Sequence, residues 1–231
     1  MNQIKAVFFD LDHTLWDFKT NSRETIADLY LRYELSNMGI GNLDAFLSVY
    51  ENINHEMWQA YGQGKIGKEH LRKGRFANTL MHFQITDDLL ADSMATDYVQ
   101  ESPRKMNLFP FVHETLSYLS GKYSLALITN GFTEVQHVKI AHCGLRDYFN
   151  HVLISEQIGF KKPHPAIFTH AASLSSAMPD QCLMVGDNLD ADIKGALDAG
   201  MKACLYDPES PPRLDGDYPI INCLSRLMSM L

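Results

Sequence analysis

Two aspartates stand two residues apart at the end of an apolar run near the start of the chain. Residues 6–9 are Ala-Val-Phe-Phe, and Asp10 and Asp12 follow with one leucine between them. Because side chains two apart on an extended backbone point the same way, both carboxylates can face one small volume. Carboxylates that close repel each other and stay ionised together only beside a cation. The pair therefore indicates a metal site, although the same spacing also occurs in ordinary turns.

Three further polar groups each lie at or after the end of an expected strand. In chain order they are Thr129-Asn130-Gly131, Lys162, and the pair Asp187 and Asp192. Each has an ordinary explanation when taken alone: a turn, a surface lysine, or acidic residues at a helix N-terminus. Together with the first pair, and in this order, they indicate one functional site.

The segments that must position these groups alternate between strands and helices from residue 108 onward. Strands are expected at 123–129, 151–154, 182–185 and 203–206, with helices at 110–120, 133–142, 166–176 and 190–199 and a short helix near the C-terminus. Strands separated by helices of this length imply right-handed crossovers. The sequence thus predicts an α/β fold whose core is a doubly wound, Rossmann-like parallel sheet. Ligands on such sheets bind beyond the carboxyl ends of the strands, where the polar groups fall.

The stretch between the first strand and residue 108 has no strand signal. Apolar residues at helical spacing predict helices at about 19–38, 43–61, 68–83 and 87–100. Residues 17–103 are therefore expected to form an all-helical cap domain inserted after the first strand. Residues 1–16 and 104–231 are expected to form the Rossmann-like core.

The overall composition narrows the choice of partners. The chain has 231 residues, 45% of them hydrophobic, and a formal net charge of -8. This charge argues against a nucleic-acid polymer or an anionic membrane surface as the main partner. Four widely spaced cysteines predict neither a zinc site nor a disulfide framework. With no apolar stretch long enough for a signal peptide or a membrane span, the expected location is cytoplasmic. Nothing in the sequence indicates an oligomeric state.

The combined groups fit phosphoryl transfer from a small-molecule monoester. Asp10 would attack phosphorus to form an aspartyl-phosphate. Asp12 would protonate the leaving oxygen and later activate water. Mg²⁺ prefers oxygen ligands, so we expect it to bind Asp10, Asp187 and, through the backbone carbonyl, Asp12.

The remaining groups would handle the phosphate. Thr129, with the backbone N–H groups of Asn130 and Gly131, would hold phosphate oxygens. Lys162 would balance the charge of the nucleophile and the phosphate. Asp192 is expected behind these groups, where it would orient Lys162 or a metal-bound water.

On these residues the sequence resembles the haloacid dehalogenase-like hydrolases. The matching motifs are Asp10-x-Asp12-x-Thr14-Leu15, Thr129-Asn130-Gly131, Lys162-Pro163 and Gly186-Asp187-x-x-x-x-Asp192. The resemblance implies a magnesium-dependent phosphatase whose helical insertion is a cap that closes over the site. The dehalogenases proper lack the second acidic residue, so the presence of Asp12 implies that dehalogenation is not the reaction.

Further segments resemble the bacterial pyrimidine 5′-nucleotidase branch of this family. They are residues 128–133, 144–149 and 154–156, together with the pattern Trp58-x-x-Tyr61-x-x-Gly64-x-Ile66 and Arg75-Phe76. This likeness implies nucleoside monophosphates as substrates. A phosphatase of sugar phosphates or phosphoglycolate, a phosphomutase, and a binding protein on the same fold stay open as alternatives.

Overall fold

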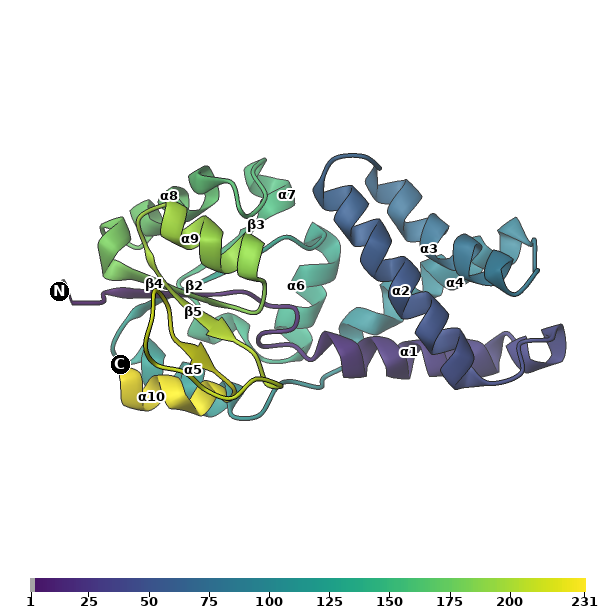
Figure 1. Ribbon diagram of the computed structural model, residues 1–231, viewed down its shortest axis with the longest axis horizontal. Coiled ribbons are helices and arrows are strands. Elements are labelled where there is room, and N and C mark those ends of the chain that lie inside the picture. Colours follow the sequence, from purple (N-terminus) through teal and green to yellow (C-terminus); the bar gives the residue numbers. More distant parts are fainter. Residues whose placement is uncertain (1–2) are drawn as a thin grey trace. The chain divides into compact units, whose positions relative to one another are not determined.

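The computed structural model describes residues 3–231 and divides the chain into two compact units. One unit consists of the chain up to Phe18 together with Met106–Leu231, and the other is Lys19–Lys105 (Figure 1). Each junction lies two residues further along the chain than the sequence predicted. Each unit is described by itself below.

The first unit is built on a six-stranded parallel sheet. Its strands are β1 (Ala6–Phe9), β2 (Ser124–Thr129), β3 (His151–Ile154), β4 (Cys182–Gly186), β5 (Lys202–Tyr206) and β6 (Ile220–Ile221). Their order across the sheet is β3-β2-β1-β4-β5-β6, and every neighbouring pair is parallel. The predicted doubly wound α/β fold is confirmed. Because the winding reverses at β1, the carboxyl ends of β1 and β4 form the edge at which such sheets bind ligands.

Helices cover both faces of this sheet. They are α5 (Val112–Ser120), α6 (Thr133–His142), α8 (Pro165–Leu174), α9 (Gly195–Asp198) and α10 (Leu227–Met230). Val7 and Phe9 of β1 pack in one apolar cluster with residues of α5, α6 and α10. Ala6 and Phe8 pack in a second cluster with residues of α8 and α9, on the opposite side of the sheet in Figure 1. The strand is buried on both faces, which explains its uninterrupted apolar sequence.

Two parts of the sheet unit differ from the sequence prediction. A short helix, α7 (Ser155–Ile158), directly follows β3, and the two-residue strand β6 was not predicted. The helix expected at 190–199 instead begins with a wide π turn, Leu189–Lys194, before α9. In this turn the Ile193 N–H donates to the carbonyl of Asn188, 3.2 Å away and five residues earlier. Neither a two-residue strand nor a widened turn produces a periodic pattern from which it could be predicted.

The second unit contains four main helices. They are α1 (Phe18–Arg32), α2 (Leu43–Gly62), α3 (Lys68–His82) and α4 (Asp88–Glu101). The helix expected at 19–38 ends early, because Glu34 adopts a left-handed conformation with φ of 49° before a 3-10 turn at Leu35–Met38. Aromatic side chains dominate the interior, with Tyr50 and Phe76 completely or almost completely buried.

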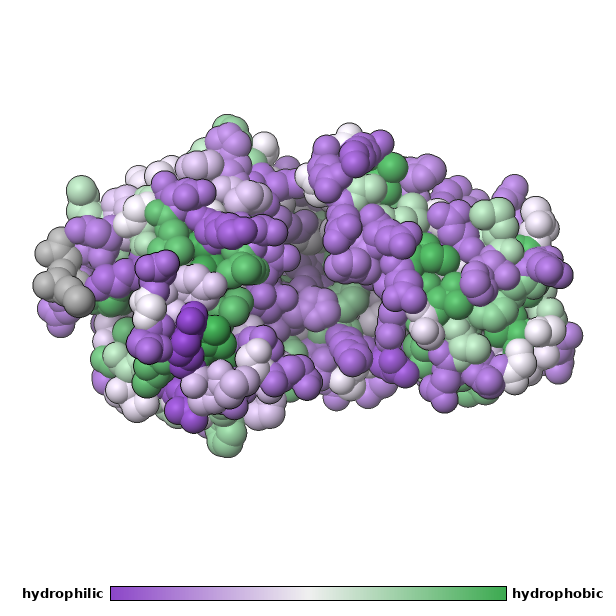
Figure 2. All heavy atoms as spheres, viewed as in Figure 1, coloured by the Kyte–Doolittle hydropathy of each residue, from purple (hydrophilic) through white to green (hydrophobic). Residues whose placement is uncertain are grey.

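The surface visible in Figure 2 is mostly hydrophilic on both units, with smaller hydrophobic patches. Among the helices of residues 3–231, none is long and apolar enough to span a membrane.

Candidate active site

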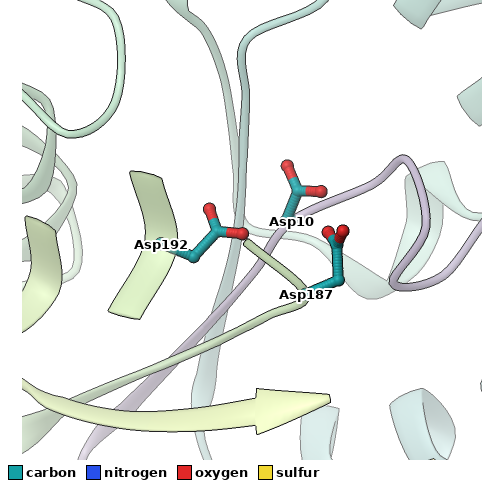
Figure 3. Close-up of side chains that lie close together, drawn as sticks. All are labelled: Asp10, Asp187 and Asp192. Atoms are coloured by element: carbon teal, nitrogen blue, oxygen red, sulfur yellow. The ribbon is translucent and has the colours of Figure 1, made fainter. Parts of the chain in front are cut away.

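Three buried or half-buried carboxylates meet at the carboxyl ends of β1 and β4. One carboxylate oxygen from each of Asp10, Asp187 and Asp192 lies within 4.8 Å of the other two (Figure 3). Asp10 directly follows β1 and extends its pairing, since the Asp10 N–H donates to the carbonyl of Val185 at 3.0 Å. Asp187 directly follows β4, and Asp192 comes from the π turn after it. The parallel pairing of two adjacent strands therefore brings together residues that are 177 positions apart.

Lys162 supplies the positive charge of this group. Its Nζ lies 2.5 Å from Asp10 Oδ1 and 2.6 Å from Asp192 Oδ1, and its side chain is almost completely buried. Burial alone would lower the pKa of Lys162, but the two aspartates raise it above its ordinary value. The lysine is therefore a permanent cation at this position. Three carboxylates against one ammonium leave two negative charges in excess when all are ionised.

Burial, together with the neighbouring carboxylates, weakens the acidity of Asp10 and Asp187. Burial raises the pKa of Asp10 well above its ordinary value, although Lys162 acts in the opposite direction. Burial and the neighbouring Asp192 raise the pKa of Asp187 to about 7. A buried group of oxygen ligands with two uncompensated charges is the environment that a hard divalent cation such as Mg²⁺ would neutralise. The residues present thus fit the expected metal.

Small and polar neighbours hold these carboxylates in place. A Cβ on Gly186 would lie 2.3 Å from Asp192 Oδ2, so only glycine leaves room for the Asp192 side chain. The same oxygen accepts a hydrogen bond of 3.0 Å from the Asn188 N–H. Thr14, a completely buried residue, lies with its hydroxyl 3.3 Å from Asp187 Oδ1 and donates to it.

Asn130 connects the loop after β2 to the loop that carries Lys162. Its side-chain Nδ2 donates to the Lys162 carbonyl at 2.9 Å, and its Oδ1 accepts from the Lys162 N–H at 2.9 Å. The sequence assigned Asn130 a phosphate contact through its backbone. The structure adds a role for its side chain, which fixes the backbone from which Lys162 reaches Asp10.

The carboxylate of Asp12 contacts α6 rather than the acidic group. Its Oδ1 lies 2.5 Å from Lys139 Nζ, and its Oδ2 accepts from Gln136 Nε2 at 2.8 Å. Burial alone would raise the pKa of Asp12, but Lys139 and Gln136 outweigh this effect and the net shift is downward. Because both carboxylate oxygens of Asp12 are bonded to α6, the backbone carbonyl is the group of Asp12 that we expect to bind a metal. This is the atom that the sequence analysis proposed.

Thr129, the last residue of β2, lies on the other side of the same glutamine. Gln136 Nε2 donates to Thr129 Oγ1 at 2.6 Å. Of the sites expected from the sequence, Asp10, Lys162, Asp187 and Asp192 thus form one group, while Asp12 and Thr129 meet at Gln136.

Gln136 and Lys139 were missed by the sequence analysis. Both lie on the buried face of α6, at the spacing shared by Phe132 and Ile140, and they are the two polar members of that face. A glutamine and a lysine at core positions of an amphipathic helix are unusual, because burying them requires polar partners. These two polar residues at core positions are the sequence feature from which the role of α6 could have been predicted.

Comparison with known proteins shows the family to which the chain belongs. A family model described as haloacid dehalogenase-like hydrolase matches residues 4–200. The chain is 32% identical over 206 residues to the pyrimidine 5′-nucleotidase PynA of Streptococcus pneumoniae, covering 88% of this chain and 84% of that protein. It is 29% identical over 215 residues to the pyrimidine 5′-nucleotidase YjjG of Escherichia coli, covering 92% and 90%. It is also 31% identical over 210 residues to a glyceraldehyde 3-phosphate phosphatase of Methanothermobacter thermautotrophicus, covering 89% and 87%.

A solved structure supports the same assignment at the level of the fold. Bacillus subtilis YfnB, crystallised with magnesium, superposes with a TM-score of 0.86 at 24% identity and covers 100% of this chain and 99% of that one. The family model covers most of the chain, including the segments that carry Asp10, Lys162 and Asp187. The chain is therefore a member of the haloacid dehalogenase-like hydrolase family.

Proposed function

We propose that this hydrolase cleaves phosphomonoesters through an aspartyl-phosphate on Asp10, with Mg²⁺ as its cofactor. The observation that carries the proposal is the position of Asp10. It lies at the carboxyl end of a central strand. Its Oδ1 is 2.5 Å from Lys162 Nζ, and one of its oxygens lies within 4.8 Å of a carboxylate oxygen of Asp187 and of Asp192. A carboxylate held between a cation and a group of oxygen ligands suits nucleophilic attack on an anionic phosphate.

The reaction would proceed in two displacements. In the first, an Asp10 oxygen bonds to phosphorus, the bond from phosphorus to the leaving oxygen breaks, and a proton passes from Asp12 to that oxygen. Asp12 is ionised beside Lys139 in the free protein, so it would take up this proton when the anionic phosphate ester binds next to it. In the second, the Asp12 carboxylate takes a proton from water as the water oxygen bonds to phosphorus and the bond to Asp10 breaks. Phosphate leaves, and Asp12 is again protonated.

The other residues would hold the phosphate and the metal. Thr129 and the backbone N–H groups of Asn130 and Gly131 would bind phosphate oxygens, and Lys162 would hold Asp10 and balance the charge. Asp10, Asp187 and the Asp12 carbonyl would bind Mg²⁺, while Asp192 orients Lys162. When bound, the ion would offset the negative charge shared by the carboxylates and the phosphate.

The proposed substrates are nucleoside monophosphates, with pyrimidines preferred. Support comes from the nucleotidase-like segments of the sequence and from the similarity to PynA and YjjG. The similarity to a glyceraldehyde 3-phosphate phosphatase, at nearly the same identity as PynA, favours small sugar phosphates as the second candidate. We further propose that the helical unit Lys19–Lys105 is the cap of this family and selects the leaving group.

Phosphate release from a panel of monoesters tests this proposal. The panel contains pyrimidine and purine nucleoside monophosphates, glyceraldehyde 3-phosphate and phosphoglycolate, each with Mg²⁺ and with a chelator. We expect the highest kcat/KM with a pyrimidine nucleotide. With the chelator, we expect no phosphate release from any ester. The Asp10→Asn variant should release no phosphate and yet show a single cooperative unfolding transition, which establishes that it is folded. Asp190→Asn removes an exposed carboxylate from the neighbouring turn and is the matched control, expected to keep full activity.

Three results would contradict parts of the proposal. Activity in the Asp10→Asn variant would exclude Asp10 as the nucleophile. Preference for a sugar phosphate would keep the chemistry and replace the substrate. Transfer of phosphate within a bound sugar, without release, would indicate a mutase.

A further inference from the structure

Helix α6 presents two buried polar side chains to Asp12. Gln136 is completely buried and Lys139 is 4% exposed, although both belong to polar residue types that usually face solvent. Their positions, three residues apart, place them on the same face of the helix. Each bonds a different oxygen of Asp12: Gln136 the Oδ2 at 2.8 Å and Lys139 the Oδ1 at 2.5 Å. The carboxylate is therefore held at both oxygens by one rigid element.

Gln136 also connects Asp12 to the expected phosphate site. Its Nε2 carries two hydrogens, and its two acceptors are Asp12 Oδ2 and, at 2.6 Å, Thr129 Oγ1. If the Gln136 amide were turned over, its Oε1 would face the Asp12 carboxylate, and two acceptors would repel each other. The orientation with Nε2 toward Asp12 is therefore the favourable one. Because the Thr129 oxygen accepts from Gln136, the threonine O–H is directed to donate elsewhere, as a phosphate oxygen requires.

Gly131 leaves the space that Gln136 occupies. A Cβ at this position would lie 2.3 Å from Gln136 Nε2 and 2.4 Å from its Cδ. Gly131 is not among the glycines with positive φ, so its backbone conformation is open to other residues. The glycine of Thr129-Asn130-Gly131 is thus explained by the volume of the Gln136 amide rather than by the turn.

Lys139 is fixed from a second direction. Its Nζ lies 4.1 Å from the centre of the Trp16 ring, which is completely buried. The Lys139 ammonium lies between an indole face and a carboxylate, and both attract its positive charge. The Lys139 side chain is only 5% exposed, so it is almost completely shielded from solvent. By contrast, the Asp12 side chain is 23% exposed. Each of its oxygens has a further lone pair for a proton or a reacting group.

We propose that Gln136 and Lys139 are positioning residues for the general acid–base Asp12, and that Gln136 couples this group to the phosphate-binding Thr129. This inference rests on the proposed function. Neither residue exchanges a proton with the substrate. Both hold the carboxyl group where it can give its proton to the leaving oxygen in the first displacement and take one from water in the second. A general acid that is misplaced by about 1 Å loses on the order of a hundredfold in rate.

Comparing esters with different leaving groups distinguishes a misplaced Asp12 from a protein that is partly unfolded, because unfolding lowers the rate for all esters alike. An alkoxide leaving group needs the proton of Asp12, whereas p-nitrophenolate or acetate leaves as a stable anion. Since kcat/KM reports only the steps up to release of the alcohol, it isolates the first displacement. Misplacing Asp12 should therefore lower kcat/KM for a nucleoside monophosphate much more than for p-nitrophenyl phosphate or acetyl phosphate.

The experiment compares these two ester classes in the full-length protein with Mg²⁺. The Asp12→Asn variant shows how much kcat/KM for the nucleotide falls, relative to the activated ester, when the general acid is removed. We expect Lys139→Gln and Gln136→Ala to lower kcat/KM for the nucleotide at least about tenfold more than for the activated ester. Gln136→Ala should also raise KM for both esters, because Thr129 loses its partner. His142→Ala, an exposed change in the last turn of the same helix, is the control and should match the wild type.

Gly131→Ala is a second, independent variant. The methyl group displaces only the far end of the flexible Gln136 side chain, so the protein should stay folded while showing the selective loss of Gln136→Ala. If both ester classes fall equally in all three variants while Asp12→Asn remains selective, the positioning role is wrong and the proposed function stands. A wild-type protein that hydrolyses neither ester class would overturn the proposed function and this inference with it.

Discussion

Replacing Asp187 with asparagine removes one negative charge from the acidic group while keeping the side-chain shape. In the folded protein, burial and Asp192 raise the pKa of Asp187 to about 7. An unfolded aspartate has a pKa of about 3.9. The folded state thus holds the proton more tightly, so the stability of the metal-free protein falls as the pH rises from about 4 to about 7. About three pKa units correspond to a loss on the order of 4 kcal/mol.

Asparagine carries no charge at any of these pH values, so the variant escapes this loss. Without divalent cations at about pH 8, we expect Asp187→Asn to be more stable than the wild type by on the order of 4 kcal/mol. For a chain of this size that corresponds to roughly 8–16 °C in Tm. Near pH 4 the two proteins should unfold at similar temperatures, because the wild-type carboxyl group is then protonated in the folded state.

Thermal unfolding followed by circular dichroism, with a chelator and with Mg²⁺, measures these differences. Mg²⁺ should raise the Tm of the wild type at about pH 8, because it binds the folded carboxylates, and should have little effect on Asp187→Asn. Asp190→Asn removes the same charge from a side chain that is 80% exposed and should behave like the wild type. A metal-free Asp187→Asn variant that unfolds below the wild type at about pH 8, or one that Mg²⁺ stabilises equally, would refute the electrostatic argument.

Three further predictions concern the groups around this cluster. Lys162→Met leaves two buried carboxylates without their cation and should destabilise the metal-free protein by about 3–5 kcal/mol, measured by urea unfolding. Gly186→Ala forces Asp192 to move and should reduce kcat at least about tenfold, whereas Gly41→Ala, where a Cβ meets nothing within 4 Å, should leave phosphate release unchanged. Asn130→Ala loses both hydrogen bonds to the loop of Lys162, which should cost about 1–3 kcal/mol in stability and raise KM for phosphate esters; an unchanged KM would exclude its positioning role.

The sheet could be predicted because its strands are buried on both faces. Such strands read as apolar runs, and Asp10 and Asp187 are conspicuous because they end two of these runs. The parallel topology then requires that both residues lie at the same edge, before any coordinates are known. The strand β6 and the π turn at Leu189–Lys194 follow from tertiary pairing and local hydrogen bonding, which leave no period in the sequence.

The roles of single residues were harder to predict than their location. The sequence indicated that Asn130 belongs to the site, but only the structure shows its side chain bound to the backbone of Lys162. Likewise, Asp12 follows Asp10 on the same strand end, yet its carboxylate is paired with α6 and not with the other acidic residues. Side-chain direction depends on partners that are distant in sequence, and a motif contains none of them.

Gly131 and Gly186 illustrate why such partners remain hidden. Gly186 is the last residue of β4 and Gly131 lies two residues after the end of β2, and each could be read as a turn residue from sequence alone. In the structure both have the same physical reason, because each leaves space for a functional polar side chain: Gln136 in one case and Asp192 in the other. A glycine without positive φ at a strand end therefore points to a neighbouring side chain that needs its volume. Searching for that side chain leads directly from the Thr129-Asn130-Gly131 motif to Gln136, and through it to Asp12.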